Sequence, residues 1–140
     1  MKKLFCLFFF YIYTKTLDIY VSSNVAVEGD GSIDKPYSNL ILALNTTIES
    51  IYNIHILSSN SNYLINNQLN ISQNSSYIFK GSNLPVIVFS NEGILNFQGP
   101  YYVTFENIQI SLSEEIYQNQ NVPIYISDTL YVNFTVFYFF

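Results

Sequence analysis

The side chains that could carry acid–base or metal chemistry are few in this chain of 140 residues. His55 is the only histidine, and it lies between two isoleucines in the apolar run 54–57, which indicates a residue on the outer face or wall of a strand. Cys6 is the only cysteine, so the chain can form neither an internal disulfide nor a zinc site with several sulfur or histidine ligands. One histidine without a serine-centred motif also predicts no catalytic triad.

The acidic residues are not arranged for catalysis either. Glycoside hydrolysis needs two carboxyl groups at a defined separation. The only adjacent pair, Glu114 and Glu115, falls in a segment that we expect to be an inserted loop, where carboxylates are solvated, and Asp128 is the only aspartate after Asp34. We therefore predict no catalytic residue, no cofactor and no metal site.

Oxygen donors alternate through the glycine-rich stretch 28–34. Glu28, Asp30, Ser32 and Asp34 recur at every second position, as the ligands of calcium loops do. An isoleucine occupies the place where a calcium loop needs glycine, and the closing glutamate is missing. The stretch is therefore predicted to be a plain turn.

The first sixteen residues, MKKLFCLFFFYIYTKT, have the order of a secretory signal peptide, with two lysines, an apolar run and short polar residues. The ten-residue apolar run, at about 1.5 Å per residue, covers only half of a ~30 Å hydrocarbon core. We expect residues 1–16 to be removed and residues 17–140 to form one secreted or cell-surface domain. A buried N-terminal strand is the alternative.

The composition favours a folded, acidic, secreted chain. Hydrophobic residues make up 49% and charged residues 11%, which argues against disorder. Beyond the leader only Lys35 and Lys80 oppose ten carboxylates, and arginine is missing, so nucleic acid is not an expected partner. Four Asn-X-Ser/Thr sequons are candidate N-glycosylation sites: Asn45, Asn70, Asn74 and Asn133.

Hydrophobic periodicity predicts one strand and one helix in the first third of the domain. Residues 18–22 alternate as a strand does. Residues 37–51 carry apolar side chains at helical spacing, with Asp34 or Ser38 as the cap and Pro36 in the first turn. We expect this to be the only helix.

From residue 52 onward, short apolar runs alternate with clusters of Asn, Ser, Gly and Gln, as strands and turns do. Taken every third run, the centres repeat in steps of about 22 to 25 residues, except across an inserted loop at 113–122. The three predicted columns are centred near residues 55, 78, 103 and 132, near 64, 87 and 110, and near 70, 95 and 125.

A three-strand unit repeating at this interval is typical of a parallel β-solenoid. Apolar residues expected to face inward alternate with polar ones in 103–105 and 108–110, and Asn107 is expected at the corner between two runs. The sequons at Asn70 and Asn133 fall on outward positions. The alternative is an antiparallel β-sandwich, although NG and DG hairpin signals between strands are missing.

Thirteen tyrosines offer a further surface. Tyr101, Tyr102, Tyr125 and Tyr131 lie in or beside neighbouring repeats, where outward rings would form a face that stacks on carbohydrate. Ordinary packing of strand aromatics on one another is the favoured interpretation, and the stacking face is the alternative.

The stretch 19–44, IYVSSNVAVEGDGSIDKPYSNLILAL, resembles the opening segment of right-handed parallel β-helix proteins, the pectin-lyase-like superfamily. In that family a strand ending in V-S precedes a glycine-rich turn, the pattern K-P-[FY]-x-x-[LI]-x-x-A-[LI] and a helix. The segment VTFENIQI, 103–110, also resembles a coil of the family. The matching residues of the opening segment are Tyr20, Val21, Ser22, Gly29, Gly31, Lys35, Pro36, Tyr37, Leu40, Ala43 and Leu44.

This resemblance implies a mainly β fold, a right-handed parallel β-helix of about three coils whose N-terminal end is capped by the helix. Polysaccharide lyases of the family use an arginine or lysine base with calcium-binding aspartates, and its hydrolases cluster aspartates on one face. This chain has no arginine and none of those clusters. A non-enzymatic secreted or cell-surface module, structural or adhesive and in contact with carbohydrate, is therefore expected.

Two alternatives stay open: a piece of a polysaccharide lyase or glycoside hydrolase whose catalytic coils lie elsewhere, and a fragment without a function of its own. The aromatic residues 137–140 offer no polar cap. We therefore expect a C-terminally truncated chain, or an end that another protein chain or a membrane surface covers.

Overall fold

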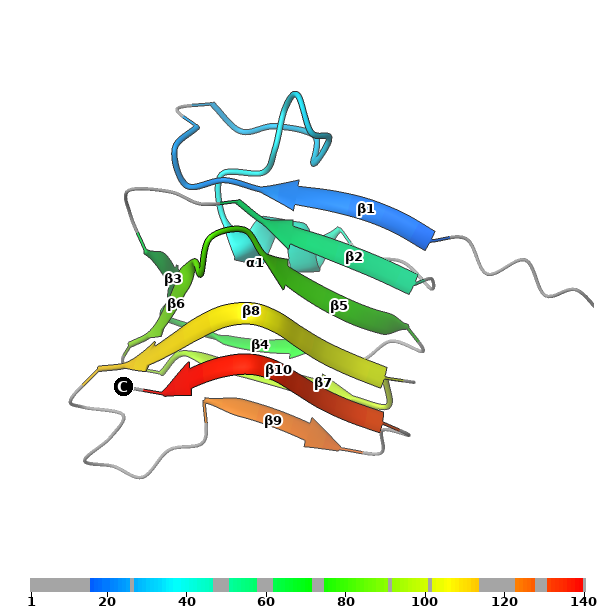
Figure 1. Ribbon diagram of the computed structural model, residues 1–140, viewed down its shortest axis with the longest axis vertical. Coiled ribbons are helices and arrows are strands. Elements are labelled where there is room, and N and C mark those ends of the chain that lie inside the picture. Colours follow the sequence, from blue (N-terminus) through cyan, green and yellow to red (C-terminus); the bar gives the residue numbers. More distant parts are fainter. Residues whose placement is uncertain are drawn as a thin grey trace, which may run out of the picture.

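The computed structural model describes residues 16–25, 27–46, 51–57, 62–71, 75–90, 92–100, 102–113, 123–127 and 131–139. The predicted leader lies outside these residues, except for Thr16, the first residue of β1. The described chain is mainly β with one short helix (Figure 1). Its elements are β1 (Thr16–Val21), α1 (Leu40–Asn45), β2 (Ile51–Ile56), β3 (Tyr63–Ile65), β4 (Gln68–Ile71), β5 (Ser76–Gly81), β6 (Val86–Phe89), β7 (Ile94–Gln98), β8 (Tyr102–Leu112), β9 (Ile124–Ser127) and β10 (Tyr131–Phe139).

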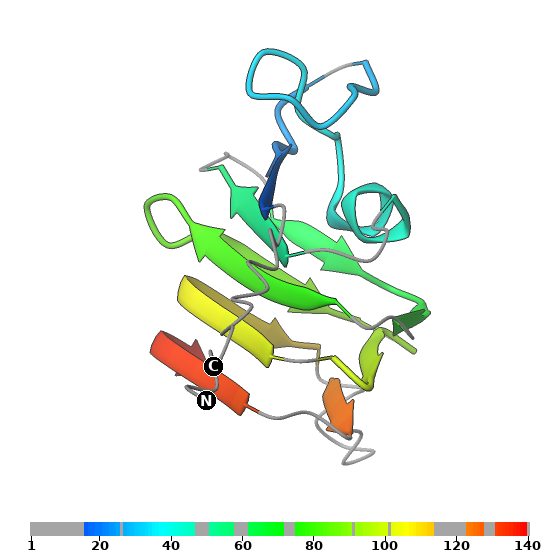
Figure 2. The same ribbon diagram turned by 90° about the vertical axis from the view of Figure 1, so that its right-hand side faces the viewer.

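The strands lie in three columns, and every described pair of strands is parallel (Figures 1 and 2). The first column is β1-β2-β5-β8-β10, the second is β3-β6 with the last part of β8, and the third is β4-β7-β9. The three predicted columns are confirmed, and β1 adds a further strand to the first. The antiparallel pairing that a β-sandwich requires is not found among the described strands.

Strand β8 differs from its prediction because it is continuous where two separate runs were expected. It bends at Asn107, whose backbone is left-handed with φ of 56°. The Asn107 side-chain amide donates to the carbonyl of Gly81 at 2.7 Å and so fixes the bend against the preceding strand of the column. The predicted corner at Asn107 is therefore confirmed, but β8 continues through it, first beside β5 and then beside β6.

The core lies between the columns and is filled by inward residues of β1 to β8, with Ile124 and Ile126 of β9 packed against it. Phe79 of β5 stacks on Phe105 of β8 with ring centroids 4.7 Å apart, and Phe97 of the third column meets Phe79 edge-on at 6.0 Å. All three are fully buried, and burying a side chain of this size contributes about 1.5–3 kcal/mol. The expected inward residues of 103–105 and 108–110 are confirmed, while Thr104, expected on the outside, is buried between Ile78 and Asn133 of the neighbouring strands.

Tyr63 of β3 ties the second column to the end of the first. Its ring is buried, and its hydroxyl lies 2.6 Å from the carbonyl of Leu57 and 3.2 Å from that of Val21. The same oxygen accepts from the backbone amide of Ser23 at 3.3 Å. One side chain thus hydrogen-bonds to backbone groups at the end of β1 and directly after β2.

The predicted helix at 37–51 is wrong in extent, because among the described residues of this segment only Leu40–Asn45 is helical. Tyr37 instead forms a parallel bridge with Val21 and donates its backbone amide to the carbonyl of Tyr20 at 2.9 Å. At the other end, Ile51 already belongs to β2 and pairs with Thr16. Strand pairing therefore overrides the helical spacing on both sides.

Asn39, rather than Asp34 or Ser38, caps α1, and its side chain accepts from the amide of Leu42 at 2.9 Å. The helix buries Leu40, Ala43 and Leu44 and lies against β1 and β3 (Figure 2). Among the described residues no helix has the length and apolar character of a membrane span.

Candidate functional site

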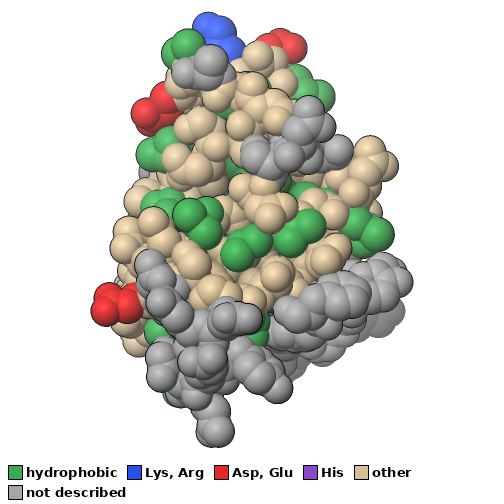
Figure 3. Space-filling view, turned by 90° about the vertical axis from the view of Figure 1, so that its left-hand side faces the viewer, with side chains coloured by type: hydrophobic (Ala, Val, Ile, Leu, Met, Phe, Trp, Pro, Cys, Tyr) green, Lys and Arg blue, Asp and Glu red, His purple; other side chains and the backbone are tan. Residues whose placement is uncertain are grey.

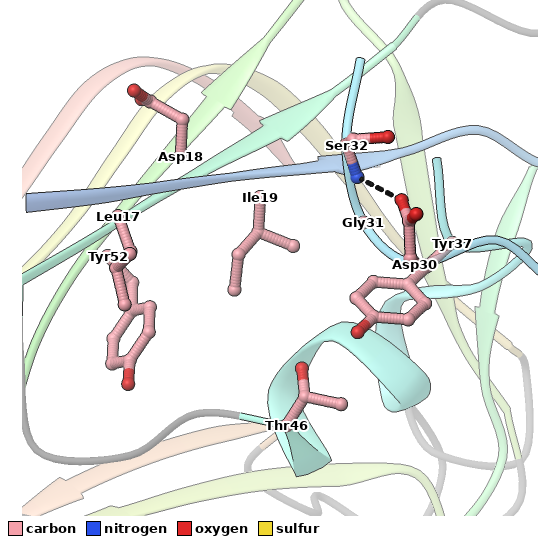
Figure 4. Close-up of a pocket in the computed structure, with 9 residues that line it drawn as sticks. All are labelled: Leu17, Asp18, Ile19, Asp30, Gly31, Ser32, Tyr37, Thr46 and Tyr52. Carbon is pink, nitrogen blue, oxygen red and sulfur yellow. Dashed lines mark hydrogen bonds between the residues drawn. The ribbon is translucent and has the colours of Figure 1, made fainter. Parts of the chain in front are cut away.

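A pocket of about 370 Å³ lies under the inner face of β1 (Figure 4). This volume falls within the range of small-molecule sites, about 300–1,000 Å³. Its lining combines apolar and aromatic side chains from β1, from β2 and from Tyr37 with polar groups from residues 30–32 and from the end of α1. The lining residues are Leu17, Asp18, Ile19, Asp30, Gly31, Ser32, Tyr37, Thr46 and Tyr52.

The turn that carries Asp30 is held by backbone hydrogen bonds on both sides. The amides of Asp30 and Gly31 donate to the carbonyl of Lys35 at 3.0 Å each, and Gly31 accepts from the amide of Tyr20 in β1 at 2.9 Å. Gly31 has a φ of 83°, and a Cβ there would lie 2.5 Å from the ring of Tyr37. Only glycine therefore lets this turn approach the pocket wall.

Asp30 forms a local turn within this loop. Its carboxylate accepts from the amide of Ser32 at 3.0 Å, and hydrogen bonds from Ser32 hold the pKa of Asp30 below its ordinary value. Glu28 and Asp34 line a separate groove. The four alternating oxygen donors thus line two separate hollows.

The outer face of the first column carries a charged row, which we define as Tyr20, His55, Lys80 and Glu106, successive partners in register. His55 is outward, as predicted, with 26% of its side chain exposed, and its ring stacks on Tyr20 with centroids 4.6 Å apart. Lys80 has no carboxylate near it in the sequence, and the pairing of β5 with β8 places Glu106 beside it.

Asp18, beside the charged row, joins β1 to β2. The same carboxylate oxygen lies 2.9 Å from Nε2 of His55 and accepts from the side-chain amide of Asn53 at 3.0 Å. These two hydrogen bonds, the one from His55 first, hold the pKa of Asp18 below its ordinary value of 3.8. Asp18 is therefore a carboxylate at neutral pH, engaged by its own neighbours.

The acids of this face are too far apart for glycoside hydrolysis. Asp18 and Glu106 are separated by three strand spacings, about 14 Å at ~4.8 Å each, whereas hydrolases need about 5–9.5 Å. The described residues contain no group of three His, Cys, Asp or Glu side chains able to hold a metal ion. Glu114, Glu115 and Asp128 lie outside the described residues.

The outer face of the third column carries what we call the amide groove, a hollow of about 260 Å³ lined by Gln68, Ile94, Asn96 and Tyr125. The side-chain oxygen of Asn70 accepts from Gln68 at 2.9 Å and from Asn96 at 2.8 Å. Asn96 pairs in register with Tyr125, and 53% of Tyr125 is exposed. The side-chain oxygen of Asn96 has no hydrogen-bond partner in the structure.

The face of four tyrosines, the less favoured interpretation, is not formed, because Tyr125 lies on a different column from Tyr102 and Tyr131. Tyr125 belongs to the third column, whereas Tyr102 and Tyr131 pair with each other in the first. Tyr101 lies outside the described residues. The predicted column centres at 70, 95 and 125 did, however, align Asn70, Asn96 and Tyr125 to within one residue, and that alignment could have identified the amide groove.

The sequons differ in their surroundings. Asn45 is exposed at the end of α1, and Asn70 is exposed beside the amide groove. Asn133 is half-buried in β10, and Asn74 lies outside the described residues.

Comparison of the chain with protein-family models, with curated proteins and with solved structures finds no match. The evidence for function is therefore the geometry of these surfaces.

Proposed function

We propose that this chain is a non-enzymatic, secreted or cell-surface module, a right-handed parallel β-helix of the pectin-lyase-like type with a structural or adhesive role. Three features support the fold: the parallel columns, the repeat of about 22 to 25 residues, and the bridge between Tyr37 and Val21 in the segment that carries the resemblance. The single N-terminal helix beside β1 agrees with its capping role.

The adhesive role rests on one observation: the exposed ring of Tyr125 lies in the amide groove beside the side chains of Asn96 and Gln68. A sugar ring presents C–H groups that pack on an aromatic face and hydroxyls that hydrogen-bond to amides. The residues that line the amide groove are uncharged, so the ligand that fits it is a neutral oligosaccharide.

The surface chemistry agrees with a binding module. Figure 3 shows the side of the molecule where β3 and β6 lie, with hydrophobic side chains scattered among uncharged polar ones and charged side chains only at its margins. Leu64 of β3 is 51% exposed. A surface with so few charges suits contact with neutral polymers or other protein chains.

The test is a titration of the full chain with cellohexaose, chitohexaose and an oligogalacturonate, followed by NMR. We expect saturable binding of a neutral oligosaccharide, weakened at least about tenfold by Tyr125→Ala and largely retained by Tyr125→Phe, which keeps the ring. Tyr20→Ala, the matched tyrosine on the charged row, should leave the affinity unchanged. An affinity that is insensitive to Tyr125→Ala, or binding of the anionic sugar alone, contradicts the carbohydrate assignment.

The same samples separate the module from the enzyme alternative. Release of reducing ends or of unsaturated sugars from the oligosaccharides would favour a lyase or hydrolase. The secretory assignment is tested separately by expression in a secreting host and N-terminal sequencing of the exported chain, which should begin near residue 17.

A further inference from the structure

The pocket under β1 lies apart from the amide groove and has a different lining. Figure 4 shows Tyr52 and Tyr37 on opposite sides of it, with Ile19 directed between them and Asp30 at the rim. Leu17 and Ile19 supply an apolar wall from β1. The site is therefore an apolar cleft between two tyrosines with a carboxylate at its mouth.

The charged side chains that line this pocket are all acidic. No lysine, arginine or histidine lines it. Lys35 lies outside the lining, and its positive charge helps to lower the pKa of Asp30. Asp18 also lines the pocket, but its side chain points to the other side of β1, toward His55. Asp30 is thus the carboxylate available to a ligand, and it is ionised at neutral pH.

Thr46 adds a hydrogen-bond acceptor to the lining. The hydroxyl of Thr46 donates to the carbonyl of Ala43 at 2.8 Å, so its oxygen is left to accept. A ligand that donates hydrogen bonds and carries positive charge therefore finds acceptors at Asp30 and Thr46. The faces of tyrosine rings also attract cations.

We propose that this pocket binds a small organic ammonium compound with an apolar or aromatic body. The ammonium group lies against Asp30, and the body fills the cleft between Tyr37, Tyr52 and the apolar wall of β1. A neutral isostere loses the contact with the carboxylate, and an anion is repelled by it. This binding is independent of the carbohydrate contact proposed for the amide groove.

The test uses three probes of one shape: phenethylamine as the cation, 2-phenylethanol as the neutral isostere and phenylacetate as the anion. The full chain is titrated with each at pH 7 by NMR. We expect phenethylamine to bind at least about tenfold more tightly than 2-phenylethanol, and phenylacetate to bind weakest.

Two variants with the same change of charge locate the interaction. Asp30→Asn should remove the preference for the amine, whereas Glu28→Gln, in the same turn but outside the pocket, should keep it. Leu17→Trp, which fills the cleft and leaves Asp30 in place, should abolish binding while the circular dichroism spectrum stays that of the parent.

Equal affinity for the amine and the alcohol would overturn the proposal. So would a preference that survives Asp30→Asn, or the absence of saturable phenethylamine binding up to about 10 mM. Oligosaccharide binding, measured on the same variants, should not change, so failure of one assignment does not affect the other.

Discussion

The charged row and the amide groove are outward faces of the same construction, yet they leave their polar groups in different states. Both rest on parallel strands in register over one shared core. On the first column, His55 of the charged row and the neighbouring Asn53 both hydrogen-bond to Asp18. On the third, the chain of amides stops at Asn96, and Tyr125 follows it exposed.

The strand register aligns outward side chains in rows on both faces. The difference shows that the identity of those side chains decides whether a row joins neighbouring strands or is open to a ligand. A row whose groups satisfy each other braces neighbouring strands. A row that ends in an exposed aromatic ring beside uncharged amides is suited to a ligand. Changes to the shared core should therefore affect both faces, and changes to either row should stay local.

The largest expected effect comes from the shared core. Phe79→Ala removes a ring that packs on Phe105 and Phe97 from different columns. We expect it to lower the free energy of unfolding by about 3–5 kcal/mol, measured by urea denaturation, with both faces lost in one transition.

Leu64→Ala is the matched control, because Leu64 is 51% exposed on β3. Its expected effect is within about 0.5 kcal/mol. If Phe79→Ala unfolded the first column and left the third intact, the two faces would not share one cooperative core.

A smaller effect is expected at the corner of β8, on the side of the charged row. Asn107→Ala loses the bond to Gly81 and forces alanine into left-handed backbone, at a cost of about 2 kcal/mol. Asn107→Gly loses only the bond and should cost about 1 kcal/mol. Hydrogen exchange should show the loss of protection around Gly81 and not at the amide groove. Equal costs for the two variants would contradict the backbone argument.

The smallest effect is the pH dependence that comes from Asp18, beside the charged row. Because the pKa of Asp18 is lowered in the folded chain, the unfolded chain binds more protons as the solution becomes acidic. The stability from Asp18 is thus fully present above its ordinary value of 3.8 and is lost as the pH falls through the folded value.

Asp18→Asn measures this contribution. At pH 7 it should cost less than about 1 kcal/mol, since 53% of the side chain is exposed to solvent. The difference from the parent should shrink as denaturation is repeated at pH 4, 3 and 2. A difference that stays constant over this range would show that the hydrogen bonds do not depend on the charge.

Much of the fold follows from the sequence, because several strands alternate apolar and polar residues and polar clusters separate the strands. The three columns could be predicted from that spacing alone. The extent of α1 could not, because the apolar residues at helical spacing in 37–51 also suit strands, and the pairings of Tyr37 with Val21 and of Ile51 with Thr16 decide the outcome.

The candidate sites depend on contacts that spacing does not reveal. The pocket under β1 requires Gly31 to approach Tyr37, and the bond between Asp18 and His55 requires the exact partners of β1 and β2. The residues of the amide groove could be predicted more nearly from the sequence, because the repeat spacing of the third column alone places Asn70, Asn96 and Tyr125 in one row.

The buried hydroxyl of Tyr63 also limits how this chain can change during evolution. It serves backbone groups at Val21, Ser23 and Leu57, two of them some forty residues away in the chain. Phenylalanine would fill the same space but leave these groups without their shared oxygen, and a shorter side chain would not reach them. Homologues that keep this arrangement should therefore retain tyrosine at this position while their outward rows diverge freely.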